Sequence, residues 1–320
     1  MFRRTGKKTS VLAMCLLAAL VVLGQPGNAF AQGPPINTDT AFVTGLQGAA
    51  LRSFFFSVRR SGLLQDGRRI SDPRDRKVSV FGLPLILPYE VLKNQLVVIG
   101  GIPILHKEMK FTADDGTRRK LSDTGFGDLF VVAKYQLLQK DGPGKTTRIT
   151  ALGRVKFPTG DDNETDEEGT PLPPALQLGT GSVDYSSGLI FTHIVRRIGV
   201  NADVIYNFNT EANNFAFGDT LRYDVALGYR LLPKVYDRYP ATQLNAFLEL
   251  NGQFARRSQA GGVSVRDSGG NVPLLSPGVQ LIYGTFLVEA SLRIPVAQDL
   301  NGTQLKFRPG FNLGFRWLMF

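Results

Sequence analysis

The sequence predicts an all-β protein, a transmembrane antiparallel up-and-down β-barrel of about 12 strands with short periplasmic turns and long external loops. Three observations favour this fold. Many segments alternate apolar and polar residues with a period of two, as a strand with one apolar face does. These segments run for about 9 to 13 residues, close to the roughly 9 to 11 that a tilted membrane strand needs. Their connections alternate between short and long, which is typical of outer-membrane barrels.

The first predicted element, residues 1–31, is a secretory signal peptide that is cleaved. Four cations near the start precede an apolar run at residues 11–23, and an A-x-A cleavage site follows at Ala29 to Ala31. The run is shorter than the roughly 20 residues of a membrane-spanning helix, which is the competing interpretation. The only cysteine, Cys15, lies in this segment, so the mature chain is expected to have no disulfide and no thiol chemistry.

Charge limits the partners of the mature chain. The formal net charge of +10 falls to +6 once the four cations of the signal peptide are removed, and the remaining cations are spread along the chain. This distribution argues against nucleic acid as a partner, because nucleic-acid binding favours a basic patch on one face. Outer-membrane lipid and lipopolysaccharide are the partners that the predicted fold implies.

Two units follow the signal peptide. Residues 32–49 are a predicted periplasmic N-terminal segment that could fold into the lumen as a plug, and residues 50–320 are the predicted outer-membrane β-barrel. Two early strands, 78–89 and 95–106, are more uniformly apolar than the others. The predicted strands cover residues 54–58, 78–89, 95–106, 129–137, 149–157, 185–193, 200–208, 221–231, 244–254, 275–283, 286–296 and 311–320.

The strand at 221–231 shows the two expected faces most clearly. Tyr223 and Val225 belong to its apolar phase, whereas Asp224 and Arg230 belong to its polar phase. Charges in the middle of a strand are costly to bury in a small core, but they are tolerated on the wall of a water-filled lumen. Other strands repeat this pattern with single interruptions, which are Ile205 and Phe247.

Connection lengths give the topology. Short turns fall at residues 90–94, 139–146, 196–199, 232–241 and 284. Long polar connections fall at residues 61–77, 107–125, 159–181, 210–220, 256–272 and 297–304. Counted from a periplasmic N-terminus, every long connection lies outside and the last strand returns the C-terminus to the periplasm. A soluble β-barrel or a sandwich is the alternative, but neither requires this parity.

The last strand is expected to close the barrel by pairing with the first. Phe311, Leu313, Phe315 and Trp317 form its apolar phase, and Phe320 lies one step out of that phase. A C-terminal aromatic strand resembles the assembly signal of outer-membrane proteins, which makes the barrel-assembly machinery an expected partner. A bulge, or a final residue that has left the ladder, would reconcile Phe320 with the outward phase.

Five sequence motifs resemble a known family. They are "GFGDLFVVAKYQLL" from Gly125, "GRVKFPTGDDN" from Gly153, "LGTGSVDYSSGLIFTHIV" from Leu178, "GDTLRYDVALGYRLLP" from Gly218 and "LLSPGVQLIY" from Leu274. Together they resemble the phenol-degradation "MetA-pathway" family of outer-membrane transporters. The resemblance implies an outer-membrane protein of a Gram-negative bacterium that passes small, often aromatic, compounds. It implies no particular functional residue.

The polar phase of the strands supplies the candidate lumen and selectivity residues. They are Lys134, Arg148, Arg154, Lys156, Asp184, Asp203, Arg222, Asp224, Arg230, Glu249, Glu289, Arg293 and Arg316. Cations lead, and a positive potential in a low-dielectric tube favours anions. The sequence therefore predicts a channel or transporter for small molecules, with aromatic or anionic organic compounds as permeants. The alternative is a structural or surface-exposed barrel whose lumen is filled by salt bridges and conducts nothing.

Other kinds of site are not predicted. The Gly-Lys-Thr at Gly144 lacks the first glycine of a phosphate-binding loop, because Gln139 stands there. The acidic loop at 161–168 lacks the turn glycine and the closing glutamate of an EF-hand, which favours a solvated external loop over a calcium site. Weak divalent binding that bridges to lipopolysaccharide is the minor alternative. Of the two histidines, His106 and His193, the latter shares its face with Ser187, but no acidic or amide partner is in phase nearby to complete a hydrolase site. No catalytic residue, metal site or cofactor is therefore expected.

Overall fold

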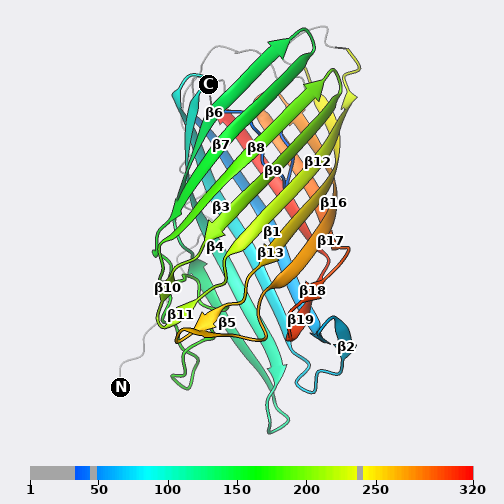
Figure 1. The fold of residues 1–320 in the computed structure, drawn as a ribbon. Helices are drawn as coiled ribbons and strands as arrows, with labels where there is room; N and C mark the ends of the chain where they lie inside the picture. Colours follow the sequence, from blue (N-terminus) through cyan, green and yellow to red (C-terminus); the bar gives the residue numbers. More distant parts are fainter. Residues whose placement is uncertain (1–32, 44–48, 236–240, 320) are drawn as a thin grey trace, which may run out of the picture.

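The computed structural model describes residues 33–43, 49–235 and 241–319, so the predicted signal peptide lies outside the described residues. Within the described residues no helix is long and apolar enough to cross a membrane. Twelve long antiparallel strands form a closed barrel (Figure 1), which confirms the predicted fold class. They are β1 (Ala49–Gln65), β3 (Lys77–Leu92), β4 (Leu96–Thr112), β6 (Phe130–Gly142), β7 (Lys145–Lys156), β8 (Asp184–Val195), β9 (Ile198–Phe208), β12 (Thr220–Leu232), β13 (Gln243–Ala255), β16 (Gly270–Tyr283), β17 (Phe286–Pro295) and β20 (Gly310–Met319).

Closure of the barrel depends on the last strand. β20 pairs with β1 over a register that runs from Ala49↔Met319 to Phe56↔Asn312. β13 pairs with β16, so each barrel strand has a neighbour on both sides. The predicted pairing of the C-terminal strand with the first strand is therefore confirmed. A closed ring leaves no edge, and in a membrane the backbone N–H and C=O groups of every strand have to be satisfied in this way.

Several strands run further than the sequence predicts. β1 and β4 have 17 residues each and continue into the connections predicted at 61–77 and 107–125. The extensions have partners of their own, because β2 (Arg68–Ile70) and β19 (Thr303–Arg308) pair with β1, and β5 (Arg118–Phe126) pairs with β4. A strand can continue beyond the apolar band wherever a partner continues its ladder, so apolar periodicity alone underestimates its length.

Four other short pieces of strand lie in the later long connections. β10 (Glu211–Ala212), β11 (Phe215–Ala216), β14 (Gln259–Ala260) and β15 (Val263–Ser264) form a separate four-stranded sheet. β18 (Asp299–Leu300) pairs with β16. Figure 1 shows these short strands at one end of the barrel and the short turns at the other end, as the alternation of connection lengths predicts.

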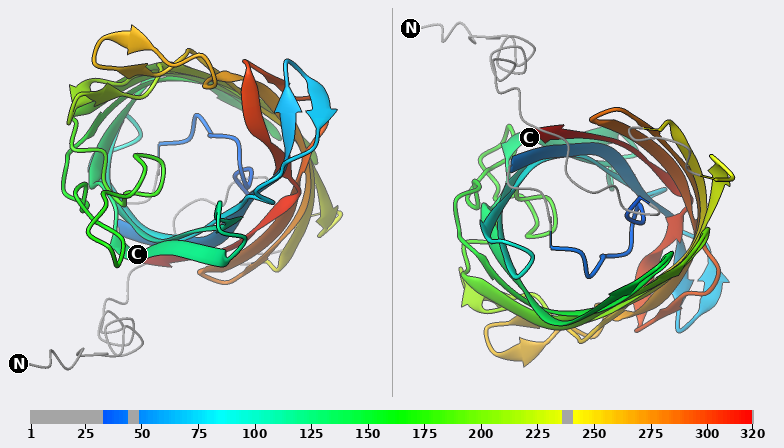
Figure 2. Two further views of the ribbon diagram at one scale, coloured as in Figure 1. Left: turned by 90° about the horizontal axis from the view of Figure 1, so that it is seen from below. Right: turned by 90° about the horizontal axis from the view of Figure 1, so that it is seen from above.

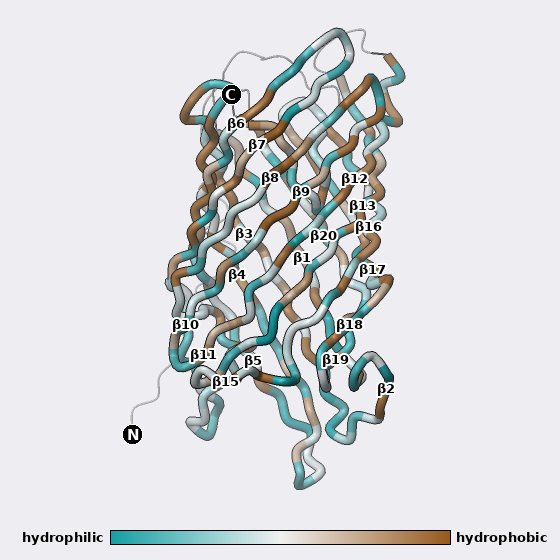
Figure 3. Tube along the Cα trace, viewed as in Figure 1, coloured by the Kyte–Doolittle hydropathy of each residue, from teal (hydrophilic) through white to brown (hydrophobic). Residues whose placement is uncertain are grey.

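The two faces of the barrel strands differ in burial. On β8, Leu189 is 56% exposed and its neighbour Ile190 is fully buried. On β12, Val225 is 50% exposed and its neighbour Asp224 is 3% exposed. Figure 3 shows apolar residues recurring along the strands of the wall. The exposed face of the strands matches the apolar band that a membrane barrel presents to lipid.

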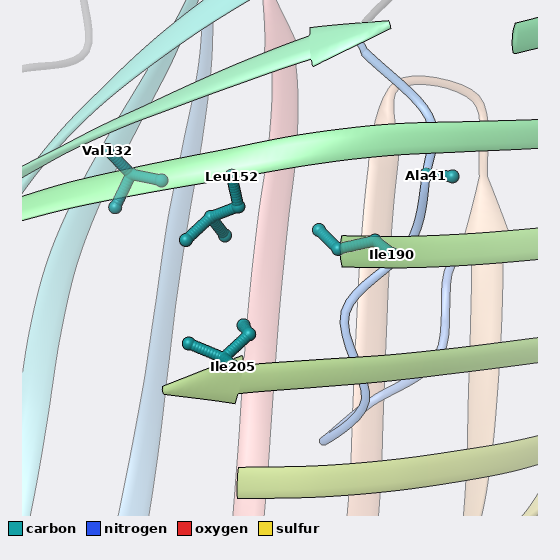
Figure 4. Close-up of a cluster of buried hydrophobic side chains, with 5 residues drawn as sticks. All are labelled: Ala41, Val132, Leu152, Ile190 and Ile205. Carbon is teal, nitrogen blue, oxygen red and sulfur yellow. The ribbon is translucent and has the colours of Figure 1, made fainter. Parts of the chain in front are cut away.

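Residues 33–43 run through the interior of the ring (Figure 2). Buried apolar side chains gather where Ala41 of this segment meets four residues of the wall (Figure 4), namely Val132, Leu152, Ile190 and Ile205. The interior of the barrel is therefore occupied by protein at this level, and the wall and the segment pack together.

Candidate functional site

The interior of the barrel is the candidate site. Its wall is joined to residues 33–43 by hydrogen bonds to the carboxylate of Glu249. The carboxylate accepts hydrogen bonds from three consecutive backbone N–H groups, which lie at 3.0 Å (Ile36), 3.0 Å (Asn37) and 2.7 Å (Thr38). The Thr38 hydroxyl also donates to it at 2.7 Å. Glu249 is fully buried. A buried carboxylate is tolerated only when its oxygens are bonded, so Glu249 depends on this segment for its partners.

Asp39 is the charged residue of the segment that joins distant parts of the wall. Its carboxylate lies 2.6 Å from Lys134 Nζ on β6 and 2.7 Å from Arg222 Nη2 on β12. Its backbone N–H donates to Asp203 at 2.8 Å. Arg222 also lies 3.1 Å from Asp203 and 3.1 Å from Asp224. Four acidic and basic wall residues are thus arranged around one carboxylate of the segment.

A second network holds the beginning of the segment. Arg316 donates to the carbonyl of Pro35 at 2.9 Å and pairs with Glu289 at 2.9 Å. Arg52 donates to the carbonyl of Ile36 at 2.9 Å and lies 3.5 Å from the same Glu289 carboxylate. The two arginines therefore share one buried acid while they bind backbone carbonyls that no strand satisfies.

The candidate residues from the sequence occupy three places. Five bind residues 33–43, and they are Lys134, Asp203, Arg222, Glu249 and Arg316. Three lie in ion pairs towards the strand ends, where Lys156 is 2.7 Å from Asp184 and Arg148 is 3.2 Å from Asp141. The remaining five lie on the inner face of the wall, and they are Arg154, Asp224, Arg230, Glu289 and Arg293. Their role in selectivity stays a prediction.

The side chains of β20 take both faces of the wall. Leu313 is 53% exposed and Phe315 is 39% exposed, whereas Asn312 is 7% exposed. Phe286 of the neighbouring strand stacks on Phe315 and on Trp317, with ring centroids 5.9 and 6.1 Å apart. Phe311 contacts Phe55 of β1 at 5.8 Å. The predicted out-of-phase residue Phe320 lies outside the described residues, and recognition of this strand by assembly machinery stays a prediction.

An apolar strip on the inner wall was not predicted. Arg52 reaches into the lumen, so Phe54 and Phe56 of the same strand share its inward face. Phe56 lies over Gly82 of β3, where a Cβ would collide with its ring. The inward phase of β3 therefore includes Ile86.

The strip continues around the wall. On β4, Gly101 lies under the ring of Phe130, so Ile99 shares the inward face. The strip consists of Phe54, Phe56, Ile86, Ile99 and Phe130, all of them half-buried. The signal for it was the uniformly apolar character of 78–89 and 95–106, which leaves no polar phase for the lumen.

The connection between β7 and β8 is anchored at the end of the barrel that carries the long connections. Asp128 accepts hydrogen bonds from the N–H groups of Gly160 and Thr180, each at 3.0 Å, and from Lys156 Nζ at 2.8 Å. Burial alone would raise the pKa of Asp128, but these bonds outweigh it and hold the pKa below its ordinary value. Figure 2 shows the connection bending over the opening from one side. Asp128 therefore shapes one mouth of the lumen.

Known proteins share this architecture. A family model described as "Putative MetA-pathway of phenol degradation" matches residues 73–295. Among solved structures, the chain is similar to the COG4313 outer membrane channel from Pseudomonas putida F1, at 16% identity over 85% of this chain and 95% of that chain, with a TM-score of 0.61. This likeness shows a shared fold.

Two other solved structures are more distant. The β domain of the Bordetella autotransporter BrkA is 14% identical over 85% of this chain and 99% of that chain, with a TM-score of 0.42. LpxR from Salmonella typhimurium is 12% identical over 83% of this chain and 99% of that chain, with a TM-score of 0.41. No curated protein matches the chain.

Proposed function

The chain belongs to the phenol-degradation MetA-pathway family, and we propose that it is an outer-membrane channel for small organic compounds, aromatic ones included, with residues 33–43 as a plug in its lumen. The long connections face the cell exterior and the short turns face the periplasm. Lipid and lipopolysaccharide surround the apolar outer face. The signal peptide at residues 1–31 directs the chain to this compartment.

The observation that supports this function most strongly is the apolar strip inside the barrel. Phe54, Phe56, Ile86, Ile99 and Phe130 face inward and are only half-buried. Apolar surface costs about 25 cal/mol per Å² when it faces water, so a channel for ions or sugars gains nothing from it. An apolar or aromatic permeant can cover this surface during passage. Its polar groups can meet the hydrogen-bonding side of the lumen.

Catalysis is not part of this proposal. His106 and His193 lie on the outer face, where each stacks on a phenylalanine, with ring centroids 6.3 and 6.5 Å apart. Each Nδ1 is bonded to a threonine hydroxyl, at 2.6 and 2.8 Å. A hydrolase of the serine and histidine kind needs a nucleophile and an acid on the two sides of the ring, and neither histidine has that arrangement among the described residues.

A filled structural barrel is the second candidate function. It is favoured by the dense bonding between residues 33–43 and the wall, where Glu249 of the wall binds the segment and Asp39 of the segment binds Lys134. In that case the plug would not move and the lumen would conduct nothing. Planar-bilayer recordings separate the two candidates, because only a channel gives conductance and a reversal potential in a salt gradient.

Uptake by whole cells tests the proposed permeants. Cells with a lipopolysaccharide-bearing outer membrane should take up dilute radiolabelled phenol faster when they produce this protein than when they carry the empty vector. Ile86→Asn, which places an amide in the apolar strip, should remove most of the gain. Val263→Asn, in the exposed sheet outside the lumen, is the matched control and should keep it. Equal uptake with and without the protein would refute the proposed function.

A further inference from the structure

Arg154 is an inward-facing arginine of β7 whose guanidinium has no acceptor in the part of the chain that the structure describes. It lies opposite Val132 on one side and Ser186 on the other, two residues from the end of the strand at Lys156. Among the described residues Arg154 forms no ion pair and no hydrogen bond through its side chain, and its Nε is buried without a partner. Its only specific contact there is with Phe130, whose ring centroid lies 4.5 Å from Cζ.

Other lumen cations near the same end are neutralised. Lys156 lies 2.8 Å from Asp128 and 2.7 Å from Asp184. Arg222 is bonded to three carboxylates between 2.7 and 3.1 Å away. The buried Nε of Arg154 is costly in the wall, because it has lost water without gaining an acceptor. Among the described residues Arg154 is therefore one of two inward arginines near this end whose Nε has no acceptor, and the other is Arg293.

The surroundings of Arg154 select the kind of anion. Cζ of the guanidinium lies over the ring of Phe130, and its two Nη groups, unlike Nε, are not buried, so they are left for an acceptor. Planar, two-oxygen acceptors such as carboxylates match these two groups. Phe130 itself covers Gly101, and Ile99 and Val132 lie beside it in the same apolar cluster. An acceptor bound here therefore has apolar wall next to it.

We propose that the lumen contains a binding site for the carboxylate of an aromatic acid, in which Arg154 holds the carboxylate and the strip around Phe130 takes the ring. The proposal rests on the proposed function, since it names one class of compound that the channel accepts. It predicts that the acid is bound more tightly than the neutral amide of the same shape.

Arg293 provides an internal control. In the described part of the chain it is the other inward arginine near the same end whose Nε has no acceptor, and it too lies two residues from the end of its strand, β17. β17 stands six strands around the ring from β7. Among the described residues no aromatic ring lies over the Arg293 guanidinium. If a general positive field attracted the carboxylate, both arginines would contribute to its binding. If the site is specific, Arg154 alone contributes.

The test measures binding to the full chain in detergent by fluorine NMR, with 4-fluorobenzoate and 4-fluorobenzamide as probes. The wild-type protein should bind the benzoate saturably, and Arg154→Gln should raise its Kd about tenfold or more, because a charge-assisted pair is lost. Arg293→Gln should change it by less than about threefold. Equal losses in the two variants, unchanged binding in Arg154→Gln, or equal binding of benzoate and benzamide by the wild type would each overturn the proposal.

Two further measurements make the outcome independent of folding and of the proposed function. Heat-modifiable migration on gels checks that each variant is a closed barrel. If Arg154→Gln does not fold, Arg154→Lys keeps the charge but loses the planar fork, and it should still weaken benzoate binding while leaving benzamide unaffected. If the wild-type protein raises phenol uptake by cells but does not bind benzoate, this proposal alone is refuted. Absence of both would remove the proposed function as well.

Discussion

At the scale of single residues, Glu249 is the strongest attachment of residues 33–43. Its carboxylate receives the N–H groups of Ile36, Asn37 and Thr38, and an amide nitrogen cannot accept any of them. Each hydrogen bond to a charged group contributes about 1.5–3 kcal/mol. Glu249→Gln should therefore release the plug in a larger fraction of molecules and raise the mean conductance at least about tenfold.

The control for this prediction is Glu90→Gln. Glu90 accepts the N–H of Asn94 in a turn between strands, and it forms no hydrogen bond or ion pair with the described residues 33–43. Conductance of the control should match the wild type in planar bilayers. If Glu249→Gln conducts no better than the control, the segment is not held by this carboxylate or does not move.

The outer face makes a second prediction at the residue scale. Val225 is 50% exposed on the lipid side of β12. Val225→Arg would place a charge near the middle of the membrane, at a cost of about 2–4 kcal/mol, so the folding yield into lipid vesicles should fall. Val263→Arg changes the same residue types in the exposed sheet outside the barrel, where the yield should not change. Normal folding of Val225→Arg would mean that this face does not meet lipid.

At the scale of elements, the connection between β7 and β8 should respond to acid through Asp128. The pKa of Asp128 is below its ordinary value, so the hydrogen bonds of its ionised form stabilise the connection at neutral pH. That stability is complete above the ordinary pKa of 3.8 and is lost as the pH falls through the lower pKa of the folded state. Proteolysis at residues 161–168 by an acid-active protease should therefore rise steeply below about pH 3.8.

Asp128→Asn is the comparison that assigns this effect. The amide cannot become charged, so the cleavage rate at neutral pH should already be raised and its dependence on acid should be weaker than in the wild type. The same acid dependence in both proteins would assign the transition to another group.

At the scale of the whole molecule, the topology can be tested on cells. An epitope inserted at Asn163, in a long connection, should be reached by antibody on intact cells. An epitope at Gly142, in a short turn at the opposite end, should be reached only after the outer membrane is opened. The reverse pattern would invert the barrel in the membrane and exchange its external and periplasmic mouths.

Patterns in the sequence predicted the wall of this barrel well because a membrane imposes one rule on every strand. Residues at i and i+2 share a face, and lipid on one side requires that face to be apolar. The same rule explains the two interruptions of the pattern. Ile205 is an inward residue that packs with Ala41, and Phe247 is an inward residue that is 4% exposed. Both residues interrupt the polar phase of their strands because protein, rather than water, covers the inner side of the wall there.

By itself the sequence determined the strands, their two faces, the alternation of their connections and the pairing of the last strand with the first, since each of these follows from local periodicity and from the need to close the ring. It did not determine which inward charges meet. Asp39 contacts Lys134 and Arg222 from a segment without periodicity, and Arg52 meets Glu289 across 237 positions of chain. Only the tertiary structure decided those contacts, because the path of residues 33–43 is set by hydrogen bonds to a wall that exists only after the barrel has closed.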